Sequence, residues 1–295
     1  MSLLASTTAI DLSRLPPPDL IETLDVEQIL AEALAQLVAI APEFTALVES
    51  DPAMKLAQVF ALRELYLRQR INEAAQGCMV AFARGGTLDH LGALFGVGRL
   101  TLTPADPVNG TSAVMENDTD YRRRIVLGPE GYSVAGPASA YVFHALSAHP
   151  DVLDVSVVSP DPGEVLITVL SRVGSGTATP TLLATVEAAV SADDVRPMTD
   201  LVTVQSAAII DFTVEAELEV YPGPDSAVVL ATALGNLAAY ADTIHRLGVG
   251  ASLSGLYAAL HVEGVVRVNL LAPTDDVDCA DHQAARLTAW NVTLG

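Results

Sequence analysis

The sequence is poor in cysteine, in lysine and in aromatic residues. Its 295 residues include two cysteines and one lysine, and 5% of them are Phe, Trp or Tyr. Cys78 and Cys279 stand far apart in the chain, so there is no disulfide framework and no Cys-x-x-Cys metal motif. These counts are typical of a chain that folds in a reducing compartment.

Positive charge is also scarce. The chain has 15 Lys and Arg against 36 Asp and Glu, which gives a formal net charge of −21. Proteins gain affinity for nucleic acid mainly through cations that displace counterions from phosphates, and the one dense basic cluster here is residues 122–124. The same deficit disfavours anionic membrane surfaces. We therefore expect neither a nucleic acid nor a membrane among the partners.

Long apolar runs are missing as well. The longest, residues 228–241, falls short of the roughly 20 residues that a membrane-spanning helix needs. The first residues lack the basic and then apolar pattern of a signal peptide. What is present is a hydrophobic content of 51%, enough for a substantial core, and a length that predicts two or three compact units.

The first part of the chain predicts an extended arm followed by helices. Three consecutive prolines at 16–18 favour an extended, Pro-rich arm over residues 1–24. Asp25 is placed as the N-cap of a helix that runs to Pro42, with Gln28 at the capping-box position. Asp51, followed by Pro52, predicts a second helix that continues to about residue 83.

Two shorter helices are expected before residue 130. Thr87 is the expected N-cap of a helix over 88–95, which Gly96 ends. Residues 118–126 predict another, which ends at Gly128. Together these patterns predict a helical region over 25–130.

The second expected helix predicts a contact with another chain. At about thirty residues it would extend roughly 45 Å, which is long for a compact domain of this size. One face carries apolar residues flanked by arginines, a composition that suits an interface. Its members are Phe60, Arg63, Leu67, Arg70 and Ile71. The alternative is that these residues pack only within the chain.

After residue 136 the pattern changes to β-branched runs that alternate with short Ala-rich helices. It predicts an α+β fold in two small domains with antiparallel sheets, at 131–208 and 209–295. A helix, turn and strand at 141–158 recur at 257–271, which indicates an internal duplication. The expected strands are 151–158, 164–171, 200–207, 211–221, 264–271 and 286–294, and the expected helices between them are 180–192 and 225–247.

Four segments contain residue types that could form a chemical site. The segment GYSVAG at 131–136 resembles a nucleophile elbow, but its second glycine comes one place late. His144, His149 and Asp151 could bind a metal, although Pro150 breaks the helix that would pair the two histidines. The remaining two, Cys279 with His282 and the acidic residues at 275–278, have the composition of solvated loops. No acid, base and nucleophile come together, so the sequence gives no positive case for an enzyme, a cofactor or a metal.

Several blocks of sequence together resemble a known family. They are LDHLGALFGV at 88–97 with Arg99, YRRRI at 121–125, PEGYSVAGP at 129–137 leading into FHAL at 143–146, and Arg196-Pro197 with Asp200. In this order they resemble the baseplate J-like family of contractile phage tails and R-type tailocins. The resemblance covers the chain from about residue 25 to its end.

The resemblance implies a structural baseplate wedge subunit without enzymatic activity. It implies that the N-terminal helices join a helical bundle with other wedge proteins, and that a second copy of the chain sits in the same wedge. The C-terminal domains would meet neighbouring wedges and close a ring around the tail hub. Assembly in the bacterial cytoplasm, a place in the virion or tailocin baseplate and a part in relaying the trigger for sheath contraction are implied as well.

Four residues are expected to shape the backbone. Asp89 and Arg99 are expected to hold the bend between helices, and Gly131 and Gly136 to occupy positions that a side chain would obstruct. Two other functions stay open at this point. One is a metal-dependent hydrolase built on His144, His149 and Asp151, and the other is a monomeric adaptor that binds a ligand.

Overall fold

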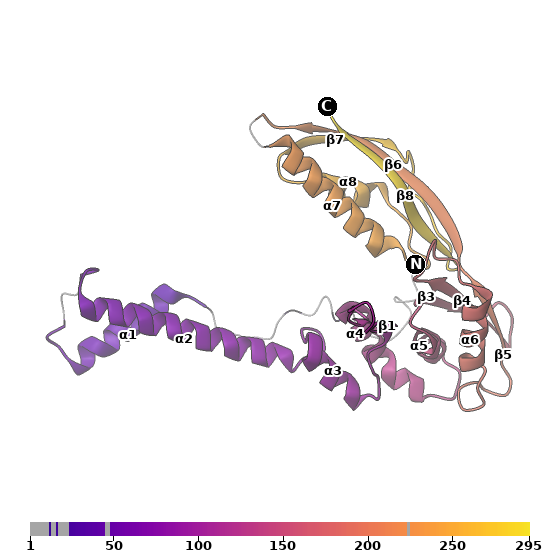
Figure 1. Cartoon of the computed structure of the whole chain (residues 1–295), viewed down its shortest axis with the longest axis horizontal. Coiled ribbons are helices and arrows are strands. Elements are labelled where there is room, and N and C mark those ends of the chain that lie inside the picture. The colour runs from indigo at the N-terminus through magenta and orange to yellow at the C-terminus, as the bar shows by residue number, and fades with distance from the viewer. Residues whose placement is uncertain (1–11, 13–15, 17–23, 45–47, 223–224) are drawn as a thin grey trace. The chain divides into compact units, whose positions relative to one another are not determined.

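The computed structural model describes residues 12, 16, 24–44, 48–222 and 225–295. Their contacts divide the chain into a helical unit within residues 10–98 and a larger unit over residues 99–295. The expected extended arm over 1–24 falls almost entirely outside the described residues. The helices and strands carry the labels shown in Figure 1.

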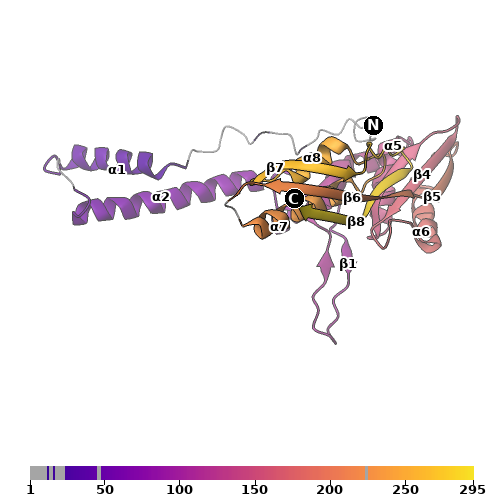
Figure 2. The same ribbon diagram turned by 90° about the horizontal axis from the view of Figure 1, so that it is seen from above.

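The helical unit is an antiparallel pair of helices followed by a short third helix. The pair is α1 (Val26–Ile40) and α2 (Pro52–Gly77), which run side by side in Figure 2, and the third helix is α3 (Gly85–Leu94). The carboxylates of Asp25 and Asp51 accept hydrogen bonds from the first turns of α1 and α2, as their positions in the sequence predicted.

Three details of these helices differ from the sequence prediction. Helix α2 has 26 residues and ends at Gly77, because the chain turns through hydrogen bonds such as Met79 N to Gln76 O. Helix α3 starts at Gly85 with Arg84 as its N-cap, so Thr87 lies inside the helix and does not cap it. Gln28 stands at the capping-box position, but its side-chain amide donates to Glu32, one turn further along α1, at 3.1 Å.

The larger unit begins with a β-hairpin and a helix that the sequence predicted only in part. The hairpin pairs β1 (Thr101–Thr103) with β2 (Val114–Met115) and is visible beside the β1 label in Figure 2. Helix α4 (Asp118–Leu127) follows and continues into the 3-10 helix η3 (Gly128–Tyr132). Helix α4 therefore ends at Gly128, its C-cap, as the sequence predicted, and the 3-10 helix after it was not predicted.

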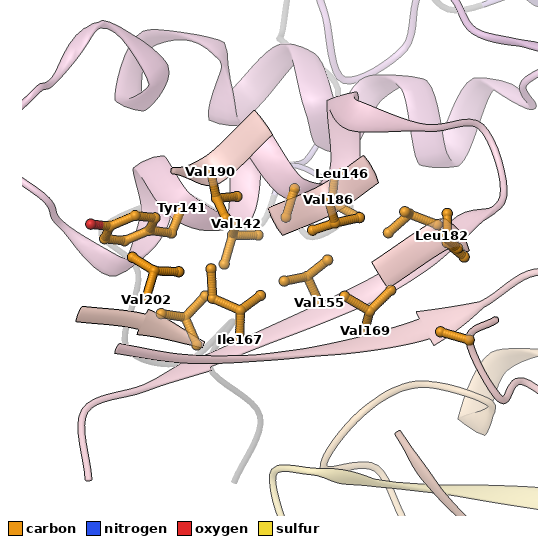
Figure 3. Packing of buried hydrophobic residues seen from close by; sticks show 14 of the residues in the cluster. Tyr141, Val142, Leu146, Val155, Ile167, Val169, Leu182, Val186, Val190 and Val202 are labelled. Atoms are coloured by element: carbon orange, nitrogen blue, oxygen red, sulfur yellow. The ribbon is translucent and has the colours of Figure 1, made fainter. Parts of the chain in front are cut away.

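The first α+β lobe packs two helices on one face of a three-stranded sheet. The helices are α5 (Ala138–Ala148) and α6 (Pro180–Val190), and the strands are β3 (Val152–Val158), β4 (Glu164–Ser171) and β5 (Leu201–Ser206), in the order β3-β4-β5. Figure 3 shows Val142, Leu146 and Val186 facing Val155 and Ile167 across this core.

The second lobe has the same kind of layering. Its sheet has the order β7-β6-β8 and two helices pack against it. Its elements are β6 (Ala208–Val220), α7 (Ser226–Ile244), α8 (Leu253–Leu260), β7 (Val265–Ala272) and β8 (Gln283–Leu294). Figure 1 shows α7 and α8 on one side of the sheet.

The α+β class is confirmed, but the sheets are mixed. In each lobe the central strand has one antiparallel neighbour, β3 or β7, and one parallel neighbour, β5 or β8. A helix crosses over between β4 and β5, which allows these two strands to run in the same direction. Hydrophobic alternation marks a strand but not its direction, so the sequence prediction of antiparallel sheets was wrong for these pairs.

The repeated helix, turn and strand are present in both lobes. Helix α5 leads into β3 and helix α8 leads into β7, and both strands are antiparallel neighbours of a central strand. The lobes differ in chain order, since the central strand follows this unit in the first lobe and precedes it in the second. They share a sheet layout with different connections.

Helix α7 is the one described helix whose length and composition would allow it to cross a membrane, with a mean hydropathy of 1.4 over its most apolar window. One side of it, including Val229, Ala233 and Leu237, packs into the core of the second lobe. Its apolar composition is therefore used, at least on that side, in folding the lobe.

Candidate partner interface

The face of α2 that the sequence singled out is exposed. Phe60 is 67% exposed, and Leu67 and Ile71 are each 61% exposed. Arg63 and Arg70 are exposed as well. At 100° per residue these five side chains fall within one stripe along α2, which we call the α2 stripe. Within the helical unit no other helix covers the α2 stripe in the described residues.

The opposite side of α2 faces α1. Ala57, Ala61 and Asn72 are buried there, and Arg68 lies 3.6 Å from Glu32 of α1. In α1 the one buried residue is Ile29. So few buried side chains give the helix pair a small core, whereas apolar burial is the main term that stabilises packed helices. The α2 stripe adds exposed apolar side chains outside this small core.

The spacing within the α2 stripe is that of a helix packed on another helix. Phe60 and Leu67 are seven residues apart, and so are Arg63 and Arg70. Repeats of seven keep the same side chains on one seam along the helix. Helix α2 also carries net positive charge in an acidic chain, since it holds four Lys or Arg and two Glu.

The two glycines expected to shape the backbone lie against other side chains. A Cβ on Gly131 would lie 2.5 Å from Cε1 of Phe143, which is closer than atoms can pack. Gly136 has a φ of +75°, and a Cβ there would lie 2.8 Å from Oδ2 of Asp200. A side chain at either position would therefore collide with its neighbours.

Asp89 and Arg99 have different surroundings. Asp89 is exposed on α3 in the helical unit. Arg99 opens the larger unit, where it donates to the carbonyl of Glu116 at 2.6 Å and to the carboxylate of Asp118 at 2.8 Å. Its guanidinium also lies over the ring of Tyr121, 4.5 Å from the ring centre. Arg99 thus joins the start of this unit to α4.

A buried ionic network around α4 was largely missed by sequence reasoning. Arg124 pairs with Glu116, Arg123 with Asp154, and Asp120 with both Arg172 and Arg246. The network holds α4 against the lobes, which is why α4 belongs to the unit over 99–295, whereas the predicted helical region extended to 130.

The histidine and cysteine segments considered as candidate chemical sites do not come together in the structure. His144 Nε2 lies 3.2 Å from the carbonyl oxygen of Gly131, and His149 lies 3.7 Å from Asp151. Among the described residues no three His, Cys, Asp or Glu side chains are placed to hold a metal ion. Burial, and next the charge of Asp278, raise the pKa of the Cys279 thiol, which keeps it protonated and weakly nucleophilic.

Comparison with known proteins decides the family. Residues 49–106 match the Baseplate J-like N-terminal domain, and residues 133–206 match the Baseplate J-like central domain. The chain is 49% identical to "Baseplate protein J" of Escherichia phage P2, over 97% of this chain and 98% of that protein. This chain belongs to the baseplate J-like family.

The two baseplate J-like domains map onto parts of the structure. The N-terminal domain match contains α2, α3 and β1, and the central domain match contains most of the first α+β lobe, including both of its helices. A cryo-EM structure of the anti-feeding prophage baseplate is also similar, with 14% identity and a TM-score of 0.42. The match covers 64% of this chain and 47% of the chain in that structure.

Proposed function

We propose that the chain is a structural wedge subunit of the baseplate of a contractile phage tail or tailocin. The observation that carries the proposal is the 49% identity to a baseplate protein J over nearly the full length of both chains. Such similarity over the full length supports the same kind of role for this chain, a structural part of an assembly. The proposed role is not enzymatic.

The partners we propose are a second copy of the chain in the same wedge and other wedge proteins, with neighbouring wedges and the tail hub beyond them. The α2 stripe supports a helical bundle as the contact within a wedge, because its apolar side chains are exposed and two of them, Phe60 and Leu67, are seven residues apart. Assembly would take place in the bacterial cytoplasm, and the baseplate would relay the contraction trigger through changes in how its parts pack.

The proposal is tested by co-expressing the chain with the proteins encoded beside it. Size-exclusion chromatography with light scattering should give a discrete heteromer that contains two copies of this chain. Leu67→Asp places a charge in the α2 stripe and should abolish the heteromer, while leaving the helical content of the isolated chain unchanged. Leu62→Asp is the matched control, because Leu62 is 43% exposed on α2 but lies outside the stripe.

Two results would contradict the proposal. A monomer that ignores the neighbouring proteins would rule out the wedge role. A heteromer that survives Leu67→Asp as well as it survives Leu62→Asp would keep the assembly role and remove the α2 stripe from it.

A further inference from the structure

The two α+β lobes of the larger unit are joined by very little chain. Strand β5 ends at Ser206 and β6 begins at Ala208, so Ala207 is the one residue between them. The apolar contact at this joint is a cluster of Leu170, Ala207, Leu247 and Ala284, against which Leu153 and Ile209 also pack. This cluster has far fewer buried members than the core of either lobe, so apolar packing stabilises the contact between the lobes less than it stabilises each lobe.

A polar contact just after α7 adds to this joint. Arg246 Nη2 donates to Oδ1 of Asp120 at 2.9 Å, and its Nη1 donates to the carbonyl of Leu153 at 2.7 Å. The next residue, Leu247, donates its backbone N–H to Oδ2 of Asp154 at 3.0 Å. Two consecutive residues of the second lobe thus bind two buried carboxylates of α4 and β3.

Each of these carboxylates divides its two oxygens between the two sides of the joint. In Asp120, Oδ2 accepts from Arg172 at 2.9 Å and from Asn117 at 3.0 Å, which leaves Oδ1 for Arg246. In Asp154, Oδ1 accepts from Arg123 at 2.7 Å and from the N–H of Val155 at 2.9 Å, which leaves Oδ2 for Leu247.

This division changes what it takes to open the joint. Breaking a buried ion pair is usually very unfavourable because it leaves a buried charge without a partner. Here Asp120 keeps Arg172 and Asp154 keeps Arg123 when the second lobe leaves. The side chain of Arg246 is 26% exposed already and would pass into water. Neither carboxylate is left without a cation.

We propose that Arg246 and Leu247 form a releasable clasp that sets the position of the second lobe against α4 and the first lobe. The clasp residues move with the second lobe, because the neighbouring His245 Nδ1 lies 2.9 Å from the carbonyl oxygen of Ala285 in that lobe. Opening the clasp lets the second lobe turn about Ala207 while both lobes stay folded. The inference goes beyond the baseplate role and does not depend on it, because it concerns the isolated chain.

The clasp is tested on the full chain by measuring a distance between the lobes. Spin labels are placed at Glu187→Cys on α6 and Asn236→Cys on α7, both exposed positions, in a Cys78→Ser and Cys279→Ala background. Pulsed electron paramagnetic resonance should give one narrow distance distribution for this protein. Arg246→Gln should broaden the distribution or shift it.

Two control variants separate the clasp from general effects of charge. Arg172→Gln removes the other arginine of Asp120 but leaves Arg246 in place, so the narrow distribution should persist. Arg267→Gln changes an exposed arginine of the second lobe, 3.9 Å from Glu219, and should have no effect. An unchanged distribution in Arg246→Gln would overturn the proposal, and so would an equal broadening in Arg172→Gln.

Hydrogen exchange gives a second readout on the same variants. In Arg246→Gln the amides of Ala207 and Leu247, which bond to Val169 O and to Asp154, should exchange about tenfold faster. The amides of β4 and of the interior of α7 should keep their protection. If β6 and α7 lose protection as well, Arg246 is required for folding of the second lobe and the clasp proposal is wrong.

Discussion

Glu116 and Arg124 meet in a two-bond contact between a carboxylate and a guanidinium. Nε of Arg124 donates to Oε1 at 2.9 Å and Nη2 donates to Oε2 at 2.7 Å. The side chains are 3% and 5% exposed. Parallel bonds between planar groups are the geometry in which arginine binds a carboxylate most strongly, so this pair fixes α4 to the strand end that precedes it.

Removing the arginine of this pair should destabilise the larger unit strongly. Arg124→Gln leaves the Glu116 carboxylate buried without its cation, and we expect the free energy of unfolding to fall by about 3–5 kcal/mol. Chemical denaturation followed by circular dichroism measures the change. Arg267→Gln, at an exposed ion pair, should stay within about 0.5 kcal/mol of the parent. Similar values for the two variants would show that the buried pair adds little.

A methyl group should be tolerated at one glycine and not at another. Gly131→Ala would press its Cβ on Phe143, and we expect a loss of roughly 1–3 kcal/mol in the free energy of unfolding. Gly235→Ala lies in α7 with no atom within 4 Å of the new Cβ, and should gain roughly 0.5–1 kcal/mol from helix propensity. A Gly131→Ala and Phe143→Ala double-variant cycle should show coupling; additive effects would contradict the contact.

Acid should weaken the larger unit through Asp120. Burial raises the pKa of this carboxyl, but the charges and hydrogen bonds of Arg246 and Arg172 outweigh it, so the pKa lies below the usual 3.8. The unfolded chain therefore takes up the proton first as the pH falls. The stabilisation is complete above pH 3.8 and is lost as the pH falls below it toward the pKa of the folded state.

Urea unfolding at a series of pH values checks this dependence. The difference in stability between the parent and Asp120→Asn should stay constant at pH values well above 3.8 and shrink as the pH falls below 3.8. Asp211→Asn is the control, since Asp211 lies 3.6 Å from Arg286 with more than half of its side chain exposed. A constant difference between the parent and Asp120→Asn would mean that Asp120 does not titrate as proposed.

A rise in pH should lower the stability of the larger unit because of Tyr141. Burial, then the hydrogen bond to Asp200 at 2.9 Å and the charge of Asp200, raise the pKa of the phenol above its usual 10. Ionisation in the unfolded chain therefore comes first, and stability is lost as the pH rises above 10. The parent should lose stability with rising pH more steeply than Tyr141→Phe. Tyr221→Phe, at a tyrosine that is 56% exposed, should follow the parent.

The sequence by itself determined most of the helices and strands, and it determined which residues form the α2 stripe. Asp25 and Asp51 cap helices because a carboxylate before an apolar period satisfies free N–H groups, and this is a local property. The same holds for strands such as Glu164–Ser171, which was expected at these bounds from its apolar run and its flanking residues. The seven-residue spacing of Phe60 and Leu67 is likewise visible without coordinates.

Only the tertiary structure decided how distant residues meet. Asp120 pairs with Arg172 and Arg246, which are 52 and 126 positions away, and nothing local to these residues indicates the pairing. The parallel pairing of β4 with β5 depends on the crossover of α6, whereas alternation in a strand carries no direction. Local patterns fix which face of an element is apolar, but the pairing of buried charges depends on where the packed lobes bring them.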